Sequence, residues 1–166
     1  KLALAHCGIS ISENDFTPLS GLHFVEVIKR LLNGHSKVDP MEVHRLKTRY
    51  FRDVGAEFLR PLPLLGLART LKGQLPVVLV TSAFKETVQI VLDELGVTNL
   101  FDVVVSGDET TMHKPDPEPY SEACKRIGVS PENCLAFEDS EVGIIAAERA
   151  GIGVVRVSRP GRGWNA

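Results

Sequence analysis

The sequence predicts an α/β protein, with a Rossmann-like parallel sheet preceded by a helical segment. Two observations support this fold class. Residues before about 75 carry helical patterns and no convincing strand, whereas the remainder alternates short β-branched runs with helical patterns. Such alternation is typical of parallel βαβ units with right-handed crossovers. We therefore expect every strand of the sheet to lie in the second part of the chain.

Three helices are expected in the first part. Gly8 ends a run typical of a helix tail, KLALAHCG. Apolar residues three or four positions apart predict a second helix over residues 22–34. Asp39 as N-cap and Pro40 in the first helical position predict a third helix over residues 39–59.

The second part should begin after two prolines in the stretch EFLRPLP, which mark a boundary near Phe58 to Pro63. We expect a helical domain over residues 1–62 and an α/β domain over residues 63–166. The first β-branched run, PVVLVT, lacks polar alternation and predicts a strand buried on both faces. The strands are expected at residues 76–81, 101–107, 133–139 and 152–158, and the helices between them at 85–96, 117–128 and 140–151.

The composition excludes several classes of partner. With 166 residues, 43% of them hydrophobic, the chain can bury a core of its own. A net charge of −2 without a basic block argues against nucleic acid. No apolar run approaches the roughly 20 residues that cross a bilayer, so no membrane is expected. Cys7, Cys124 and Cys134 lack CxxC spacing, and we expect reduced thiols in a cytoplasmic protein, monomeric or weakly dimeric.

Ligands of parallel sheets bind outside the carboxyl ends of the strands, so the residues that follow each run are the candidate site. Thr81 ends its strand with a hydroxyl, and the amides of Ser82 and Ala83 lie where the next helix begins. A hydroxyl and backbone N–H groups at a helix N-terminus suit an oxyanion such as phosphate. The alternative is that Thr81 caps the helix and binds nothing.

A lysine lies in the loop after the second predicted strand, where prolines restrict the backbone. Lys114 lies in the stretch HKPDPEPY, where Pro115 and Pro117 restrict the backbone around it. A compact ammonium held there is a suitable counter-charge for phosphate or for a carboxylate nucleophile. The alternative is a solvated lysine in a rigid turn.

Two adjacent carboxylates, Glu138 and Asp139, follow the third strand. They repel each other and lose hydration at the end of a sheet unless a cation compensates them. Oxygen ligands favour a hard ion, and Mg²⁺ usually takes one or two carboxylates together with waters and a substrate phosphate. The alternative is that Asp139 or Ser140 caps the following helix. Together, the strand-end residues predict a site that binds a phosphoryl group.

In their order, VVLVTSA, SGDETTMHKPDPEPY and CLAFEDSEVGIIAAERAG strongly resemble three motifs of the haloacid dehalogenase superfamily. The nearest branch is the phosphatases with a helical cap, which includes phosphoglycolate phosphatase and beta-phosphoglucomutase. The resemblance implies a cap before an α/β core, and it implies Mg²⁺ as cofactor. It assigns Thr81 and Lys114 to catalysis and phosphate binding, and Glu138 and Asp139 to the metal.

The first motif of that superfamily, DxDG, carries an aspartate nucleophile on a strand in the middle of the sheet, and the sequence contains no DxD. We expect the chain to be an N-terminally shortened part of a larger enzyme that lacks this strand; the alternative is a naturally complete pseudoenzyme. The implied activity is Mg²⁺-dependent hydrolysis of small phosphorylated metabolites through an aspartyl-phosphate. The 166-residue chain alone should be inactive.

The resemblance also implies that residues of the cap recognise the substrate. The stretch PLSGLHF resembles the specificity loop of the cap, which makes Gly21 and His23 candidate substrate contacts; a solvent-facing His23 is the alternative. The mutase branch carries basic residues where this chain has Ser20 and Phe24, which disfavours a sugar-phosphate mutase. A non-catalytic phosphate-binding or regulatory module remains the hypothesis from a different class.

Overall fold

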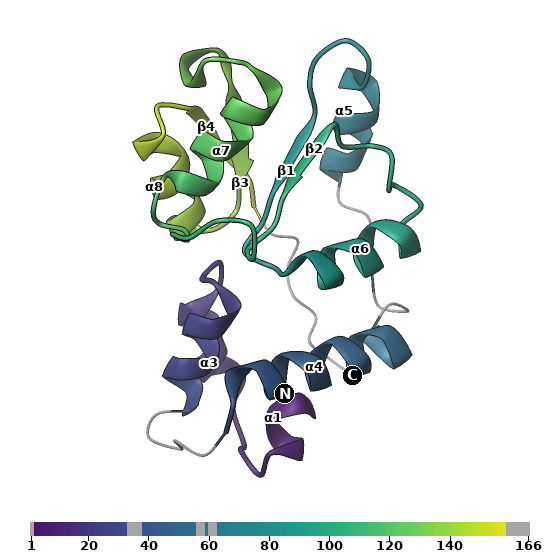
Figure 1. Ribbon diagram of the computed structural model, residues 1–166, viewed down its shortest axis with the longest axis vertical. Coiled ribbons are helices and arrows are strands. Elements are labelled where there is room, and N and C mark those ends of the chain that lie inside the picture. The colour runs from purple at the N-terminus through teal and green to yellow at the C-terminus, as the bar shows by residue number, and fades with distance from the viewer. Residues whose placement is uncertain (1, 33–37, 56–58, 60–62, 159–166) are drawn as a thin grey trace.

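The computed structural model describes residues 2–32, 38–55, 59 and 63–158. Figure 1 shows a group of helices that contains α1, α3 and α4 at one end of the molecule and the strands at the other end. Helix α6 lies between the strands and α4. None of the described helices is long and apolar enough to cross a membrane.

Every regular element described in the first part of the chain is a helix. It contains α1 (Leu2–His6), α2 (Glu13–Phe16), the 3-10 helix η1 (Thr17–Leu19), α3 (Phe24–Leu32), α4 (Pro40–Tyr50) and the π-helix η2 (Phe51–Gly55). Asp39 caps α4, because its carboxylate accepts a hydrogen bond of 2.9 Å from the N–H of Met41. The N-cap predicted for this helix is therefore confirmed.

The second part alternates strands with helices, as predicted. Its elements are α5 (Pro63–Leu71), β1 (Val78–Val80), α6 (Lys85–Glu94), β2 (Val103–Val105), α7 (Glu118–Ile127), the 3-10 helix η4 (Pro131–Asn133), β3 (Leu135–Glu138), α8 (Glu141–Arg149) and β4 (Gly153–Arg156). Helix α5 was not predicted. The predicted boundary near Phe58 to Pro63 lies largely outside the described residues, and the division into two domains stays a prediction.

The strands form two separate parallel pairs. Strand β1 pairs with β2, with Val80 opposite Val105. Strand β3 pairs with β4, with Glu138 opposite Arg156. Among the described residues no ladder joins β1 to β3, so each pair has an unpaired edge strand. This is the arrangement expected if a central strand is missing from the sheet.

Two apolar clusters hold helices against the strands. In the first, Val88 and Leu92 of α6 are buried together, and Leu79 and Val104 lie against them. In the second, the buried residues come mainly from α7 and α8, and the strands contribute partly buried side chains. The buried members of this second cluster are Tyr120, Cys124, Ala146, Ala147 and Ile152, and Val80, Ala136 and Val154 pack on them.

Strand β1 is nevertheless only half-buried. The prediction of a strand buried on both faces is therefore wrong for these residues. Leu79 packs on one cluster and Val80 on the other, but no described strand pairs with the outer edge of β1. The second pair of strands is open as well, since Leu135 and Phe137 of β3 are 59% and 39% exposed.

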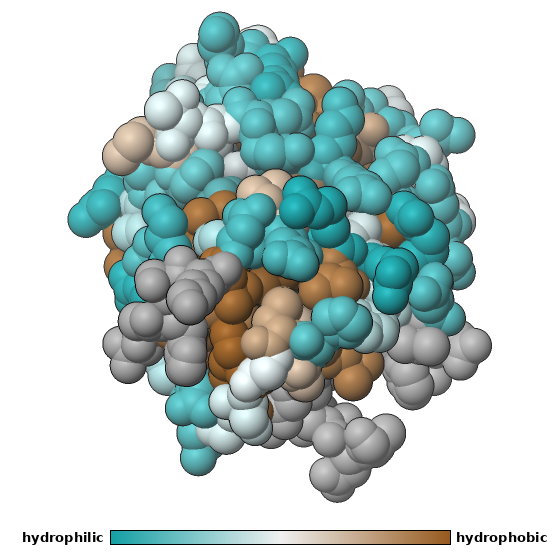
Figure 2. All heavy atoms as spheres, turned by 60° about the horizontal axis from the view of Figure 1, so that its bottom comes forward, coloured by the Kyte–Doolittle hydropathy of each residue, from teal (hydrophilic) through white to brown (hydrophobic). Residues whose placement is uncertain are grey.

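The helices at the other end of the molecule have their own core. Its buried residues are Ala3, Leu4, Ile9, Ile28, Leu32 and Val43. Figure 2 looks onto this end and shows apolar atoms gathered in one area of an otherwise mostly hydrophilic face. The helices thus fold around a cluster that is distinct from the two that pack on the strands.

Candidate active site

Lys114 lies at the centre of the candidate site. It is in the loop between β2 and α7, and its side chain is 6% exposed. Its ammonium donates to the carbonyl oxygen of Val80 at 3.2 Å, contacts the Tyr120 hydroxyl at 3.3 Å and forms an ion pair with Glu138. Val80 ends β1 and Glu138 ends β3, so one side chain contacts both strand pairs. The alternative of a solvated lysine is wrong.

The Glu138 carboxylate is held by three donors. Its Oε1 accepts from Lys114 and, at 2.5 Å, from Tyr120, while its Oε2 accepts from the Ser140 hydroxyl at 3.1 Å. Burial opposes ionisation, but the Lys114 ammonium and these hydrogen bonds outweigh it, so the pKa of Glu138 lies below its usual value. Burial, together with the neighbouring carboxylate, raises the pKa of Tyr120, which stays protonated and donates.

Two features of this cluster bear on the sequence analysis. Tyr120 was not predicted as a site residue, although it ends the stretch HKPDPEPY that contains Lys114. Ser140 caps α8, since its hydroxyl accepts from the N–H of Gly143 at 3.2 Å. At Gly143 an added Cβ would overlap the Glu138 carboxyl group, so the close approach of α8 to Glu138 requires glycine.

The turn after β1 differs from the prediction in one respect. The N–H of Ala83 donates to Thr81 Oγ1 at 3.1 Å, so this amide is already used within the turn. The Ser82 hydroxyl donates to the carbonyl oxygen of Gly21 at 2.8 Å. This bond uses the oxygen of Thr81 and leaves its hydroxyl proton available. Ala83 does not present a free N–H, because the turn folds its amide back onto Thr81.

All of the predicted site residues except His23 line one cavity of about 480 Å³. Its polar end is formed by residues that end or follow β1 and β3 or lie in the loop after β2: Thr81, Ser82, Lys114, Glu138 and Asp139. The opposite wall is apolar and comes from the first part of the chain, with Leu19, Leu22, Phe24, Val27, Ile28, Leu31 and Val43. A cavity of this size and lining suits a small molecule with one charged end.

The loop before α3 lies directly against the polar end. Gly21 lines the cavity, and an added Cβ there would lie 2.7 Å from Ser140 Cβ. His23 is buried, so the solvent-facing alternative is wrong. It is not among the residues that line the cavity and instead stacks on His113, with ring centroids 3.6 Å apart. Burial, aided by the charge of His113, lowers the pKa of His23 to about 4.

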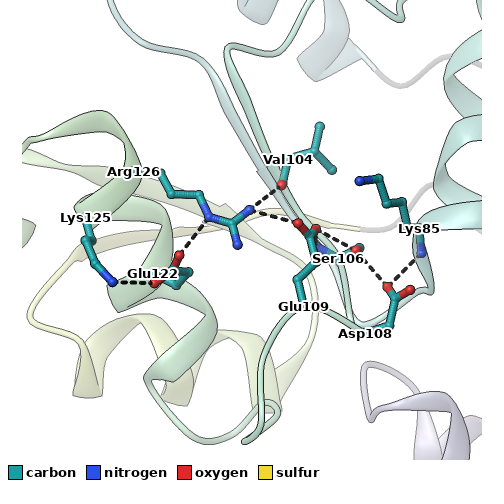
Figure 3. Close-up of polar contacts among 8 residues, drawn as sticks. All are labelled: Lys85, Val104, Ser106, Asp108, Glu109, Glu122, Lys125 and Arg126. Carbon is teal, nitrogen blue, oxygen red and sulfur yellow. Dashed lines mark hydrogen bonds and ion pairs between the residues drawn. The ribbon is translucent and has the colours of Figure 1, made fainter.

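A network of polar contacts fixes the loop after β2, as Figure 3 shows. The buried Ser106 hydroxyl lies 2.8 Å from Asp108 and 2.7 Å from Glu109. Arg126 of α7 reaches back to Glu109 at 3.0 Å, and Asp108 accepts from the N–H of Lys85 at 2.9 Å. These contacts tie the loop that leads to Lys114 to the helices on either side.

The carboxylates fit a hard cation in part. Asp139 lines the cavity, whereas Glu138 offers mainly Oε2, because its Oε1 already takes two donors. Among the residues that the structure describes, no group of three or more His, Cys, Asp or Glu is arranged around a metal position. One or two carboxylates are nonetheless what Mg²⁺ takes when water and phosphate complete its shell. The donor set therefore suits Mg²⁺ more than it suits zinc, which prefers nitrogen and sulfur ligands.

Comparison with known proteins adds to this geometry. Residues 1–151 match the family model of haloacid dehalogenase-like hydrolases. The chain is 30% identical to the fructose-1-phosphate phosphatase YqaB of Escherichia coli (strain K12) over 155 residues, which are 93% of this chain and 82% of YqaB.

Two solved structures share the fold. A mutant of CbbY from Rhodobacter sphaeroides, in complex with xylulose-(1,5)bisphosphate, is similar with a TM-score of 0.84 and 26% identity, over 95% of this chain and 76% of that one. The beta-phosphoglucomutase of Clostridium difficile has a TM-score of 0.79 and 23% identity, over 95% and 74% of the two chains. At that identity, the second likeness concerns the fold alone.

Proposed function

The chain belongs to the family of haloacid dehalogenase-like hydrolases, and we propose that it forms the cap and the phosphate-binding core of a Mg²⁺-dependent phosphatase. Its substrates would be small phosphorylated metabolites, as the names of YqaB and of the CbbY complex suggest for those relatives. The observation that carries this proposal is that Thr81, Lys114 and Asp139 line one cavity.

Each of these residues has a role in the proposed reaction. Thr81 would donate its hydroxyl proton to a phosphoryl oxygen, and Ser82 would contribute its backbone N–H, since its hydroxyl proton is held by Gly21. Lys114 would balance the negative charge that the phosphoryl group brings, with Glu138 and Tyr120 fixing its ammonium. Asp139, with Oε2 of Glu138, would hold Mg²⁺, which supplies charge stabilisation to the phosphoryl oxygens.

The nucleophile would be an aspartate on a further strand between β1 and β3. Support for this position comes from the two unpaired strand edges and from the absence of a DxD sequence among the 166 residues. A carboxylate oxygen would attack phosphorus while the bond to the substrate oxygen breaks and that oxygen takes up a proton. Water would then hydrolyse the aspartyl-phosphate to aspartate and inorganic phosphate.

The test is an assay of the natural protein that contains this chain, with p-nitrophenyl phosphate and acetyl phosphate. We expect hydrolysis with Mg²⁺ and its loss on chelation. Asp139→Asn should raise the Mg²⁺ concentration needed for half-maximal rate, whereas Lys114→Ala should lower turnover even at saturating metal. Absence of hydrolysis with intact phosphate binding would favour the non-catalytic module instead. Isomerisation of a sugar phosphate without release of phosphate would favour the mutase.

A further inference from the structure

The cavity contains a second cation at its apolar wall, Lys47 of helix α4. Helix α4 runs alongside α6 (Figure 1), and the Lys47 ammonium donates to the hydroxyl of Thr87, in the first turns of α6, at 3.2 Å. The ammonium also lies 4.8 Å from the centroid of the Phe24 ring, and both residues line the cavity. Lys47 thus lines the cavity from the first part of the chain, and Lys114 lines it from the second.

The two cations differ in how their charge is balanced. Lys114 is paired with Glu138, whereas no ion pair joins Lys47 to a carboxylate among the described residues. The carboxylate whose charge acts on Lys47 is Glu86, which pairs with Arg52 at 3.1 Å on an exposed surface. Burial lowers the pKa of the Lys47 ammonium, and the charge of Glu86 opposes this.

The surroundings of Lys47 leave part of its bonding capacity unused. An ammonium has three N–H donors, and one of them is directed to Thr87. Phe24 lies beside the ammonium and has no acceptor side chain, and neither do Val27 and Val43, which also line the cavity. A charge in such a place is costly unless a partner of opposite charge reaches it.

We propose that Lys47 binds a second negatively charged group of the substrate, at the end away from the phosphoryl group that Thr81 and Lys114 receive. This inference rests on the proposed function and narrows its substrate class to phosphorylated molecules that also carry a carboxylate or a second phosphate. The first part of the chain would then select substrates by charge as well as by apolar shape.

Paired ligands that differ by one charged group test this assignment. Fructose 1,6-bisphosphate and fructose 1-phosphate differ by a phosphate, and phosphoglycolate and ethyl phosphate differ by a carboxylate. Their dissociation constants are measured by titration calorimetry on the natural full-length protein, kept free of metal with EDTA so that hydrolysis does not intervene. We expect the member with two charged groups in at least one pair to bind about tenfold more tightly, as a hydrogen bond to a charged group implies.

Substitutions identify the residue responsible. Lys47→Met should bring the ratio of the two dissociation constants in a pair close to one, while the member with one charged group binds as before. Lys47→Arg should keep most of the preference, because it restores the charge. Two matched controls should keep the full ratio: Thr87→Val removes the partner of Lys47 in α6, and Arg49→Met removes an exposed charge from the same helix. Circular dichroism checks that each variant is folded, and Lys47→Gln replaces Lys47→Met if the latter does not fold.

The outcomes separate this inference from the proposed function. A preference in the fructose pair alone would assign a second phosphate, and one in the phosphoglycolate pair alone would assign a carboxylate. A preference that persists in Lys47→Met, or no preference in either pair, would overturn the role of Lys47. Hydrolysis with Mg²⁺ but without a charge preference would contradict this inference only. A preference lost in Lys47→Met, in a protein that never hydrolyses a phosphate ester, would contradict the phosphatase and leave the role of Lys47 standing.

Discussion

Lys114 and Glu138 form a buried ion pair between the ends of two strand pairs, with side chains that are 6% and 8% exposed. Removing one partner of a buried pair leaves the other charge without compensation, which is more costly than removing both. Each partner therefore depends on the other, and loss of either one alone should destabilise the fold.

This relationship predicts a specific pattern of stabilities. Lys114→Met should lower the free energy of unfolding by about 3 kcal/mol. The double variant Lys114→Met/Glu138→Gln should recover part of that loss, because no uncompensated charge remains. Urea unfolding followed by circular dichroism measures both. Arg156→Met breaks the exposed pair with Glu141 and serves as a control that should change stability little. Equal losses in the single and double variants would contradict the prediction.

Tyr120→Phe should weaken the same cluster by removing one donor. The hydroxyl donates to a charged carboxylate in a buried place, so we expect a loss of about 1.5 kcal/mol in the free energy of unfolding. Tyr50→Phe is the matched control, since the Tyr50 hydroxyl contacts the His6 ring at 3.3 Å in an exposed position. Its loss should be clearly smaller. Similar losses in the two variants would mean that the hydrogen bond of Tyr120 contributes no more to the free energy of unfolding than an exposed contact does.

Two glycines in helices should respond in opposite directions to alanine. In α8, Gly143→Ala would push a methyl group into the Glu138 carboxyl, and we expect a loss of about 2 kcal/mol from this overpacking. In α5, an added Cβ at Gly66 meets nothing within 4 Å. There Gly66→Ala should stabilise the protein by about 0.5 kcal/mol, because alanine is the better helix former. Thermal unfolding of both variants measures these changes. A shift of both melting temperatures in the same direction would contradict the prediction.

His23 predicts a dependence of stability on pH. Its pKa is lowered to about 4 in the folded protein, from an ordinary value of 6.5. Between these values the unfolded chain binds a proton that the folded protein excludes, so stability is complete above pH 6.5 and falls as the pH approaches 4. His113 strengthens this effect and Asp108 opposes it.

The expected loss from His23 over that range is at most about 3 kcal/mol, at 1.36 kcal/mol for each pKa unit, and solvent screening reduces it. Urea unfolding at a series of pH values measures it. In His23→Gln the decline between neutral pH and pH 4 should become shallower, because the variant has no imidazole to protonate. A decline of unchanged steepness in the variant would assign the effect to other groups.

Local signals in the sequence predicted the features that depend on neighbouring residues. Asp39 was predicted as a cap, and Ser140 was one of two candidates for a cap in an alternative interpretation, because an N-cap bonds to an N–H two or three positions away. The polar residues after β1 and β3 were recognised because a strand end is visible in a short window. The order of strands and helices predicted that the ends of these strands lie at one edge of the sheet. Lys114, Glu138 and Asp139 do line one cavity.

Features that depend on distant contacts were missed. Nothing near Glu138 in the sequence reveals that Lys114, 24 positions earlier, is its partner. His23 was open to either reading because its burial depends on the ring of His113. Helix α5 was not predicted, because Pro63 was interpreted only as the end of the boundary near Phe58 to Pro63, although proline suits the first turn of a helix. Lys47 lies in an ordinary amphipathic pattern, and only the position of α4 brings it to the cavity.

The contacts of Lys114 have a consequence for how this lysine can change over evolution. Its ammonium is bonded to Val80 at the end of one strand pair and to Glu138 at the end of the other. A homologue without catalytic activity would still lose stability if this lysine were replaced. Other contacts would then have to connect the two strand pairs. Selection for folding alone is therefore enough to preserve the lysine. Its presence in a sequence therefore reflects the architecture of a protein as well as the chemistry of its cavity.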